Sequence, residues 1–375
     1  MSSGLSGKIR ERIRRTGPVT FEAFMAMALY EPGMGYYTNP ETGIGRAGDF
    51  YTSPHLHPAF GWMLARQLEE MWALMGKGRL DVIEQGPGMG YLAKDILDYL
   101  ADKELYAELN YHLVELNPAL AASQKKLLER HGARISWHEN LSGLRCEKGV
   151  IIANELLDAF PVHVVQLNET RLNGWWQEVF VGLEGGKKFI EVLAPPSTGE
   201  IAEYLEEFLP KDEEFPQGYR TEVNLAMKGW VKEVSGIFAQ GFVICIDYGY
   251  PAWDYYSPER NRGTLLCYHR HQVSEDPYSN AGTQDMTAHV NFSALKKWGG
   301  ENGLRALGFC PQGTYLISAG MEEIMRGLSQ PDILKIKGLL LPGTMGETHK
   351  VMVLYKGQGS PELKGFKLRD QLKNL

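Results

Sequence analysis

The sequence predicts an α/β fold built on a doubly wound, Rossmann-like sheet. Residues 79–161 alternate short apolar runs with helical patterns, which is typical of a parallel sheet between helices. The apolar run at 80–84 ends in an acid, and a glycine-rich loop and a helical pattern follow it. A further buried-strand pattern lies at 241–247, and a final antiparallel strand pair is expected near the end of the chain.

The expected elements follow one another along the chain. Thr20 is placed to cap a helix that ends at Pro32-Gly33, and a second helix is expected at about 57–75. In the core, the pattern predicts strands and helices at 80–84, 91–101, 111–115, 118–131, 134–137, 150–153 and 241–247. The final pair is predicted at Thr314–Ser318 and Val351–Tyr355.

Nearly 90 residues separate the core strands at 150–153 and 241–247, too many for one crossover helix. This gap holds alternating runs at 162–168, 174–182 and 187–193, and helices expected at 199–209 and about 222–238; Glu184–Lys187 predicts a hairpin. We therefore predict a helical and lid extension at 1–78, a core at 79–161 and 239–375, and an inserted substrate-side α+β subdomain at 162–238.

Composition limits the possible partners and compartments. The chain has 375 residues and a net charge of −7, which argues against a nucleic-acid partner. The four cysteines have no CxxC spacing, so we expect free thiols in a reducing compartment. No apolar run reaches the roughly 18 residues of a membrane span, and no apolar stretch follows the basic N-terminal residues. We expect a cytoplasmic protein without membrane insertion.

The loop Glu84-Gln85-Gly86-Pro87-Gly88-Met89-Gly90 predicts a nucleotide-like cofactor. Glycine is needed where φ is positive or where a ligand approaches the backbone, and a helix N-terminus favours anionic groups. The dinucleotide fingerprint requires a glycine where Tyr91 stands, and no Gly-Lys-Ser/Thr follows for a phosphate loop. The pattern instead resembles the first motif of S-adenosylmethionine (SAM)-dependent methyltransferases.

Two later segments support this interpretation. Glu115 ends the second expected strand, 25 residues after Gly90, where a carboxylate can accept both ribose hydroxyls. Asn140, in the loop after the third strand, is a candidate for hydrogen bonding to the adenine, with Trp137 or Leu141 packing on it. An ordinary strand-to-helix turn is the alternative for the glycine loop by itself.

The fourth expected strand ends in a segment that carries two carboxylates, Glu155 and Asp158. Ligands of doubly wound sheets bind at the carboxyl ends of the strands. Paired carboxylates suit a guanidinium, which stays protonated and offers a planar fork of donors. Glu222 or Asp247 is a further candidate for this contact. The alternative is that Glu155 or Asp158 only caps the next helix.

Seven ordered motifs resemble the MidA family. They are Gly17-Pro18…Gly35-Tyr36-Tyr37, Gly48-Asp49-Phe50-Tyr51-Thr52-Ser53-Pro54, the Glu84–Gly90 loop, Asn154–Pro161, Glu222-Val223-Asn224, Asp247-Tyr248-Gly249 and Asp285–Phe292. Mitochondrial members of that family assist respiratory complex I assembly and methylate an arginine. The resemblance implies a seven-stranded core whose last strand is antiparallel, SAM as cofactor, and symmetric dimethylation of a protein arginine. It also marks Gly48, Asp49, Thr52 and Ser53 as residues of the cofactor pocket or lid.

The chain departs from the family pattern at three positions. His55 and His57 stand where the family usually has an acid and a serine, and Asn291 stands where it usually has aspartate. His55/His57 and His269/His271 have metal-ligand spacing on a strand, but no third ligand has a recognisable spacing, so no metal site is predicted. His289 is expected to bond to Asp285 one helical turn away, with a role as base left open.

The aromatic loop from Tyr248 to His271 carries Arg260, Arg262 and Arg270, and we expect it to grip a peptide. A non-catalytic assembly or scaffold protein on the same fold, and a small-molecule methyltransferase, remain as alternatives. The sequence leaves the methyl-accepting protein and the oligomeric state open.

Overall fold

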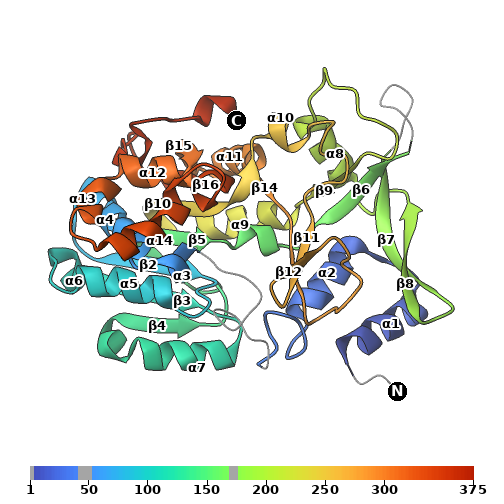
Figure 1. Cartoon of the computed structure of the whole chain (residues 1–375), viewed down its shortest axis with the longest axis horizontal. Coiled ribbons are helices and arrows are strands. Elements are labelled where there is room, and N and C mark those ends of the chain that lie inside the picture. Colours follow the sequence, from blue (N-terminus) through green and yellow to red (C-terminus); the bar gives the residue numbers. More distant parts are fainter. Residues whose placement is uncertain (1–3, 41–52, 169–175) are drawn as a thin grey trace. The chain divides into compact units, whose positions relative to one another are not determined.

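The computed structural model describes residues 4–40, 53–168 and 176–375 (Figure 1). Its contacts divide the chain into two units. The first unit comprises Met1–Gly43, Asp158–Gly229 and Tyr250–Ala294, and the second unit comprises Ile44–Leu157, Trp230–Gly249 and Leu295–Leu375. This grouping places 250–294 with the first unit, whereas the sequence analysis assigned that segment to the core; the three-part domain division stays a prediction.

A mostly parallel sheet forms the centre of the second unit. Among the described residues, seven strands follow the order β15-β16-β10-β5-β2-β3-β4 (Figure 1). Their bounds are β2 (Leu80–Gln85), β3 (Leu109–Val114), β4 (Ile135–His138), β5 (Cys146–Asn154), β10 (Phe238–Tyr250), β15 (Arg305–Pro311) and β16 (His349–Lys356). The strands from β10 to β4 are parallel, and β16 is antiparallel to both β10 and β15. The α/β fold and the antiparallel last strand are therefore confirmed.

Both faces of this sheet are buried. Val82 lies opposite Val150 in the register, and both belong to the hydrophobic core that α4 and α5 cover. Ile83 and Ile151, one position further along, point to the other face and are equally buried. Continuous apolar strands buried on two faces are characteristic of a doubly wound sheet.

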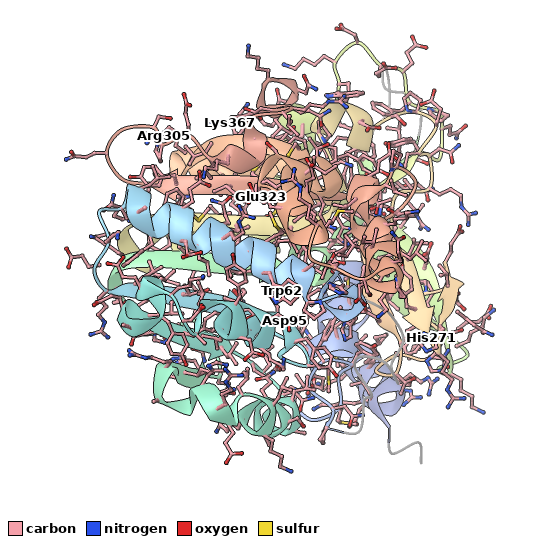
Figure 2. All side chains as sticks on the ribbon, turned by 60° about the vertical axis from the view of Figure 1, so that its left-hand side comes forward. Trp62, Asp95, His271, Arg305, Glu323 and Lys367 are labelled. Carbon is pink, nitrogen blue, oxygen red and sulfur yellow. The ribbon has the colours of Figure 1, made fainter. Side chains whose placement is uncertain are left out.

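Helices of the second unit pack against the sheet and against one another. They are α3 (Ser53–Leu56), α4 (Ala59–Leu74), α5 (Tyr91–Leu100), α6 (Glu104–Glu108), α7 (Pro118–Leu127), α12 (Gln312–Ser318), α13 (Met321–Met325), α14 (Gln330–Leu340) and α15 (Met345–Thr348). A Cβ added to Gly61 of α4 would lie 2.5 Å from the Cβ of Asp95 on α5, so these two helices need glycine at their contact. Figure 2 labels Asp95 and the neighbour of Gly61, Trp62.

The predicted strand at 314–318 is wrong. These residues belong to α12, and the partner of β16 is β15 (Arg305–Pro311). Gln312, Gly313, Tyr315 and Leu316 are the buried residues of α12, a helical spacing that packs one face inward. The β-branched and aromatic content of the segment therefore misled the assignment, because tertiary packing outweighs intrinsic strand propensity.

The first unit is built on an antiparallel sheet. Its path is β1-β7-β6-β9, with β8 paired to β7. The bounds are β1 (Val19–Thr20), β6 (His163–Leu167), β7 (Trp176–Glu184), β8 (Lys188–Ala194) and β9 (Arg220–Val223). These strands confirm the three alternating runs, and β7 and β8 form the expected hairpin. A smaller sheet joins β11 (Leu266–His269), β12 (Gln272–Ser274) and β13 (Asp285–Thr287), and β14 (Val290–Asn291) follows it in the chain.

Among the described residues, four α-helices lie within the first unit, and two others run from the first unit into the second. The four are α1 (Leu5–Thr16), α2 (Phe21–Tyr30), α8 (Gly199–Phe208) and α10 (Ala252–Tyr255); the two are α9 (Ala226–Ser235) and α11 (Phe292–Glu301). Thr20 caps α2 as expected, since its hydroxyl accepts a hydrogen bond from the backbone N–H of Ala23 at 3.1 Å. No helix within the described ranges is long and apolar enough to cross a bilayer.

Candidate functional site

The glycine loop between β2 and α5 has the backbone conformation that only glycine adopts easily. Gly86, Gly88 and Gly90 have φ values of 68°, 53° and 81°. A Cβ at Gly86 would lie 3.1 Å from Leu156 Cδ1, and one at Gly90 would lie 3.1 Å from Gln124 Cγ. A Cβ at Gly88 would meet nothing within 4 Å. Gly88 therefore borders open space, and a side chain there would occupy the room that a ligand needs.

Two acids flank this loop, the buried Glu84 and the half-buried Glu115. Glu115 follows β3, and its carboxylate accepts the backbone N–H of Asn117 at 2.8 Å and the Gln124 amide at 3.0 Å. Burial raises the pKa of Glu115 to about 7, although these hydrogen bonds oppose the shift. Burial, with the nearby charge of Glu115, also raises the pKa of Glu84 to about 7, against a 2.6 Å hydrogen bond from the Tyr111 hydroxyl. Both acids therefore change charge near neutral pH.

Gln124, which the sequence analysis missed, links the parts of this site. Its Nε2 donates to the carbonyl of Gly88 at 2.7 Å and to Glu115 Oε2 at 3.0 Å, and its Oε1 accepts from the Trp137 indole at 3.1 Å. The side chain is fully buried on α7. One amide thus fixes the glycine loop relative to the strand-end acid, a role that no local sequence pattern signals.

The remaining predicted cofactor residues occupy different settings. Asn140 is exposed, and its Oδ1 accepts the backbone N–H of Ser142 at 2.9 Å, whereas Leu141 is buried. The backbone N–H of Glu115 donates to the carbonyl of His138, so the loop with Asn140 begins beside Glu115. Contact of Asn140 or Leu141 with an adenine stays a prediction. Gly48, Asp49 and Thr52 lie outside the described residues.

Glu155 has a strained backbone at the end of β5. Its φ of 48° is in the left-handed region that non-glycine residues rarely adopt. Its Oε1 accepts the backbone N–H of Ser53 at 3.1 Å, and its Oε2 lies 3.6 Å from Nε2 of His349. The Leu156 side chain that follows lies against Gly86, so this turn adjoins the glycine loop. Strain of this kind concentrates at functional sites.

Asp247 anchors the same turn. Its carboxylate accepts the backbone N–H groups of Leu156 at 3.1 Å and Leu157 at 2.9 Å. Burial, followed by the charge of Glu155, raises the pKa of Asp247. Its three backbone donors, with Tyr248 as the third, indicate a residue that positions the Glu155 turn.

His349 is a second residue that the sequence analysis missed. It begins β16, is fully buried, and packs against Tyr248 with ring centroids 4.0 Å apart. Because β16 is antiparallel to β10, its first residue lies beside the last residues of β10. The antiparallel pairing therefore brings a histidine from the end of the chain to the edge where Glu155 and Asp247 lie.

The other three predicted catalytic residues belong to the first unit. Asp158 is buried, and its backbone carbonyl accepts the N–H of Ala288 at 2.9 Å. Glu222 is also buried, and its carboxylate accepts from the Thr264 N–H and hydroxyl at 3.0 Å and from the Tyr255 hydroxyl at 3.1 Å. These donors give Glu222 a structural task, namely holding the turn at 263–265.

The helical spacing that suggested a His289–Asp285 bond does not exist. Asp285 lies in β13 and His289 lies between β13 and β14, so the two are not one helical turn apart. The Asp285 carboxylate accepts from the Tyr37 hydroxyl at 2.6 Å, and the His289 ring packs against Tyr250 at 5.3 Å. Asn291 caps α11 by accepting the backbone N–H of Ser293 at 3.0 Å, as an aspartate would.

The site in the second unit fits SAM. The cofactor has a ribose with two hydroxyls and a charged methionyl end. Glu115 offers a carboxylate at the strand end for the hydroxyls, and the loop at Gly88 offers room and backbone groups beside the first turn of α5. Fold and site together define a SAM-dependent methyltransferase of the doubly wound class.

Comparison with known proteins gives the family. Residues 63–310 match the model of the family described as "Putative S-adenosyl-L-methionine-dependent methyltransferase", and the chain belongs to that family. The human mitochondrial protein arginine methyltransferase NDUFAF7 is 30% identical, with 92% of this chain and 82% of the human protein covered. The Drosophila melanogaster homologue is 26% identical, with 94% and 85% covered.

A solved structure agrees over nearly the whole chain. A Burkholderia thailandensis protein bound to S-adenosyl-homocysteine superposes with a TM-score of 0.89 at 32% identity, covering 99% of this chain and 96% of that one. A native crystal structure of an uncharacterized Burkholderia thailandensis protein gives a TM-score of 0.87, also at 32% identity. The expected cofactor, SAM, and the expected family are thus confirmed.

Proposed function

We propose that this methyltransferase acts on the guanidinium group of an arginine in a protein. The observation that carries the proposal is Glu155, a carboxylate held in a strained backbone conformation at the carboxyl end of β5, beside the glycine loop. When bound, SAM supplies an electrophilic methyl group on a sulfonium. An acceptor nitrogen must be aligned with that group, and alignment provides most of the rate in such a displacement.

The residues around Glu155 suit a guanidinium. A carboxylate grips the planar fork of an arginine through paired hydrogen bonds and so orients one nitrogen. The Ser53 N–H and the backbone anchor at Asp247 fix the position of the Glu155 carboxylate. In this proposal, His349, whose Nε2 lies 3.6 Å from Glu155 Oε2, takes up the proton that the guanidinium releases after methylation.

The proposal gives different roles to Asp158, Glu222 and His289. Asp158 remains a candidate second carboxylate, because it is buried in the family motif that begins at Asn154. Glu222 supports the turn at 263–265, and a direct contact with the guanidinium is left as a prediction. His289 donates its backbone N–H to the Thr264 hydroxyl at 2.9 Å, which ties it to the same turn.

The names of the relatives support the choice of arginine. The human, rat and fly proteins are each named a mitochondrial protein arginine methyltransferase. By the family resemblance, the substrate we propose is a subunit of a respiratory complex, the product is symmetric dimethylarginine, and the role is in complex I assembly. The cytoplasmic location expected from the sequence also remains a proposal.

The test is to incubate the purified chain and SAM carrying a labelled methyl group with a cell extract. Label should enter a discrete protein band, and hydrolysis of that band should release methylarginines. Label in a low-molecular-weight fraction would favour the small-molecule alternative. If the unchanged chain transferred no more label to protein than Glu155→Gln, although both chains bind S-adenosylhomocysteine, the result would favour the scaffold alternative.

A further inference from the structure

Three polar side chains converge on one face of the main sheet, within the second unit. In the register of β3 and β4, His112 lies opposite Ser136, and His138 is two residues further along β4. Register partners on neighbouring strands, and residues two apart on one strand, point to the same face of a sheet. Parallel pairing thus brings two imidazoles and a hydroxyl together, although 24 positions separate His112 from Ser136 in the chain.

The donor atoms of these side chains form a small triangle. His112 Nδ1 lies 3.0 Å from His138 Nε2 and 2.9 Å from Ser136 Oγ, and His138 Nε2 lies 3.3 Å from Ser136 Oγ. Ligand atoms that share one ion at about 2.1 Å lie roughly 3.0–3.4 Å from one another in octahedral or tetrahedral geometry. The triangle therefore has the size of one face of a metal coordination shell.

Asp81 fixes the orientation of the His112 ring. Its Oδ1 lies 3.0 Å from Nε2 of His112 and accepts from the Asn110 amide at 3.1 Å. Because an ionised carboxylate only accepts hydrogen bonds, the His112 proton stays on Nε2, and the lone pair of Nδ1 faces the triangle. A histidine that binds a metal almost always donates its other N–H to such an acceptor.

Solvent reaches the residues of the triangle. The side chains of His112 and Asp81 are 17% and 12% exposed, and Ser136 and His138 are half-buried. Trp137, between them on β4, packs against the hydrophobic core on the opposite face of the sheet. The triangle thus lies on a partly solvated face of the sheet, where an ion can arrive from solution.

The types of donor atom select the ion. Imidazole nitrogen suits first-row transition ions such as Zn²⁺, Ni²⁺ and Cu²⁺, whereas Mg²⁺ and Ca²⁺ prefer oxygen ligands. In the part of the chain that the structure describes, no group of three or more His, Cys, Asp or Glu side chains is arranged to hold a metal. Two imidazoles and a hydroxyl would leave the other coordination positions to water, which suits an exchangeable ion rather than a closed structural centre.

We propose that His112, His138 and Ser136 bind an exchangeable divalent transition-metal ion, with Asp81 as the positioning residue of His112. His138 binds through Nε2 in the tautomer that carries its proton on Nδ1. The backbone carbonyl of His138 accepts the N–H of Glu115 at 2.9 Å, so the ion site adjoins the acid expected to bind the ribose. The inference does not depend on the identity of the methyl acceptor.

Calorimetric titration of Zn²⁺ into the full chain, in a buffer that does not chelate the ion, tests the site. We expect binding with a Kd of about 100 µM or lower. His112→Gln or His138→Gln removes a ligand and should weaken binding about tenfold or more. Asp81→Asn should weaken it by about tenfold, because the carboxylate orients His112 without touching the ion.

His271→Gln is the matched control. It removes an exposed histidine of the first unit (Figure 2), which belongs to the His269/His271 pair, and should leave the affinity for Zn²⁺ unchanged. Circular dichroism should show that each variant is folded. The EPR spectrum of Cu²⁺ bound to the unchanged chain should show coupling to two imidazole nitrogens, and this measurement stands even where a variant fails to fold.

Several outcomes overturn the inference. They are no heat of binding up to about 1 mM Zn²⁺, equal affinity in the unchanged chain and in folded His112→Gln and His138→Gln, loss of the ion in His271→Gln, and a Cu²⁺ spectrum without imidazole nitrogens. Full affinity in a folded Asp81→Asn would exclude Asp81 as the positioning residue.

Discussion

Glu115 and Glu222 are both acids beside a backbone turn, but their burial and their donors differ. Glu115 accepts from Asn117 and Gln124 and is only half-buried, so a ligand can still reach it. Glu222 is buried and accepts from both the N–H and hydroxyl of Thr264, from Leu265 and from Tyr255. An acid with few protein donors can therefore bind a ligand, whereas an acid with several protein donors stabilises a turn of the protein itself.

A substitution in the glycine loop should cause the greatest loss of cofactor affinity. Gly88→Val places a β-branched side chain at a φ of 53° and fills the open space beside the loop. The affinity for S-adenosylhomocysteine should fall by about 100-fold or more, which is roughly 2.8 kcal/mol. Calorimetric titration measures the affinity, and circular dichroism should show an unchanged fold. Full affinity in a folded variant would exclude Gly88 from the cofactor site.

Removing Glu222 should affect stability first. Glu222→Ala leaves the donors of the 263–265 turn buried without an acceptor, so we expect a loss of about 3 kcal/mol in the free energy of unfolding. Glu222→Gln retains one acceptor oxygen and should lose less. Urea unfolding followed by tyrosine and tryptophan fluorescence gives the comparison. If stability were unchanged and methylation were lost, the result would support a direct contact between Glu222 and the methyl acceptor.

Glu115 should make cofactor binding depend on pH. Its pKa is raised to about 7, and the ribose hydroxyls are best accepted by the ionised carboxylate. Below pH 7 binding must remove the proton, so affinity should fall up to tenfold for each pH unit below about 7 and level off above it. Titrations of S-adenosylhomocysteine across this range provide the test.

Two variants show whether Glu115 or Glu84 causes the pH dependence of cofactor binding. Glu115→Gln should weaken binding about tenfold at pH 8 and remove the slope. Glu84→Gln controls for the second group whose pKa is raised to about 7. A slope that persists in Glu115→Gln and vanishes in Glu84→Gln would assign the dependence to Glu84.

Gln124 should give the smallest effect. Gln124→Leu keeps the volume but removes the bonds to Gly88 and Glu115, so the loop loses its fixed position without losing its glycines. We expect affinity to fall by about three- to tenfold, the cost of one or two hydrogen bonds. The same calorimetric titration measures it. No change would mean that the loop needs no support from α7.

The sequence predicted what depends on local backbone pattern. The glycine loop, the strand that precedes it and Glu115 lie within one βαβ unit, so spacing alone located them. Gln124 and His349 were not predicted, because their roles arise from contacts with residues far away in the sequence. Gln124 donates a hydrogen bond to Gly88, and the antiparallel β16 brings His349 close to Glu155. The helical interpretation of Asp285–His289 failed because β13 pairs with β11 there, which four residues of sequence cannot reveal.

We propose that Glu155 holds the methyl acceptor and not the cofactor. The most direct measurement compares Glu155→Gln with the unchanged chain for both S-adenosylhomocysteine binding and the transfer of labelled methyl to protein arginine in a cell extract. We expect unchanged binding and a loss of transfer of about 100-fold or more. Unchanged transfer, or an equal loss of cofactor binding, would contradict it.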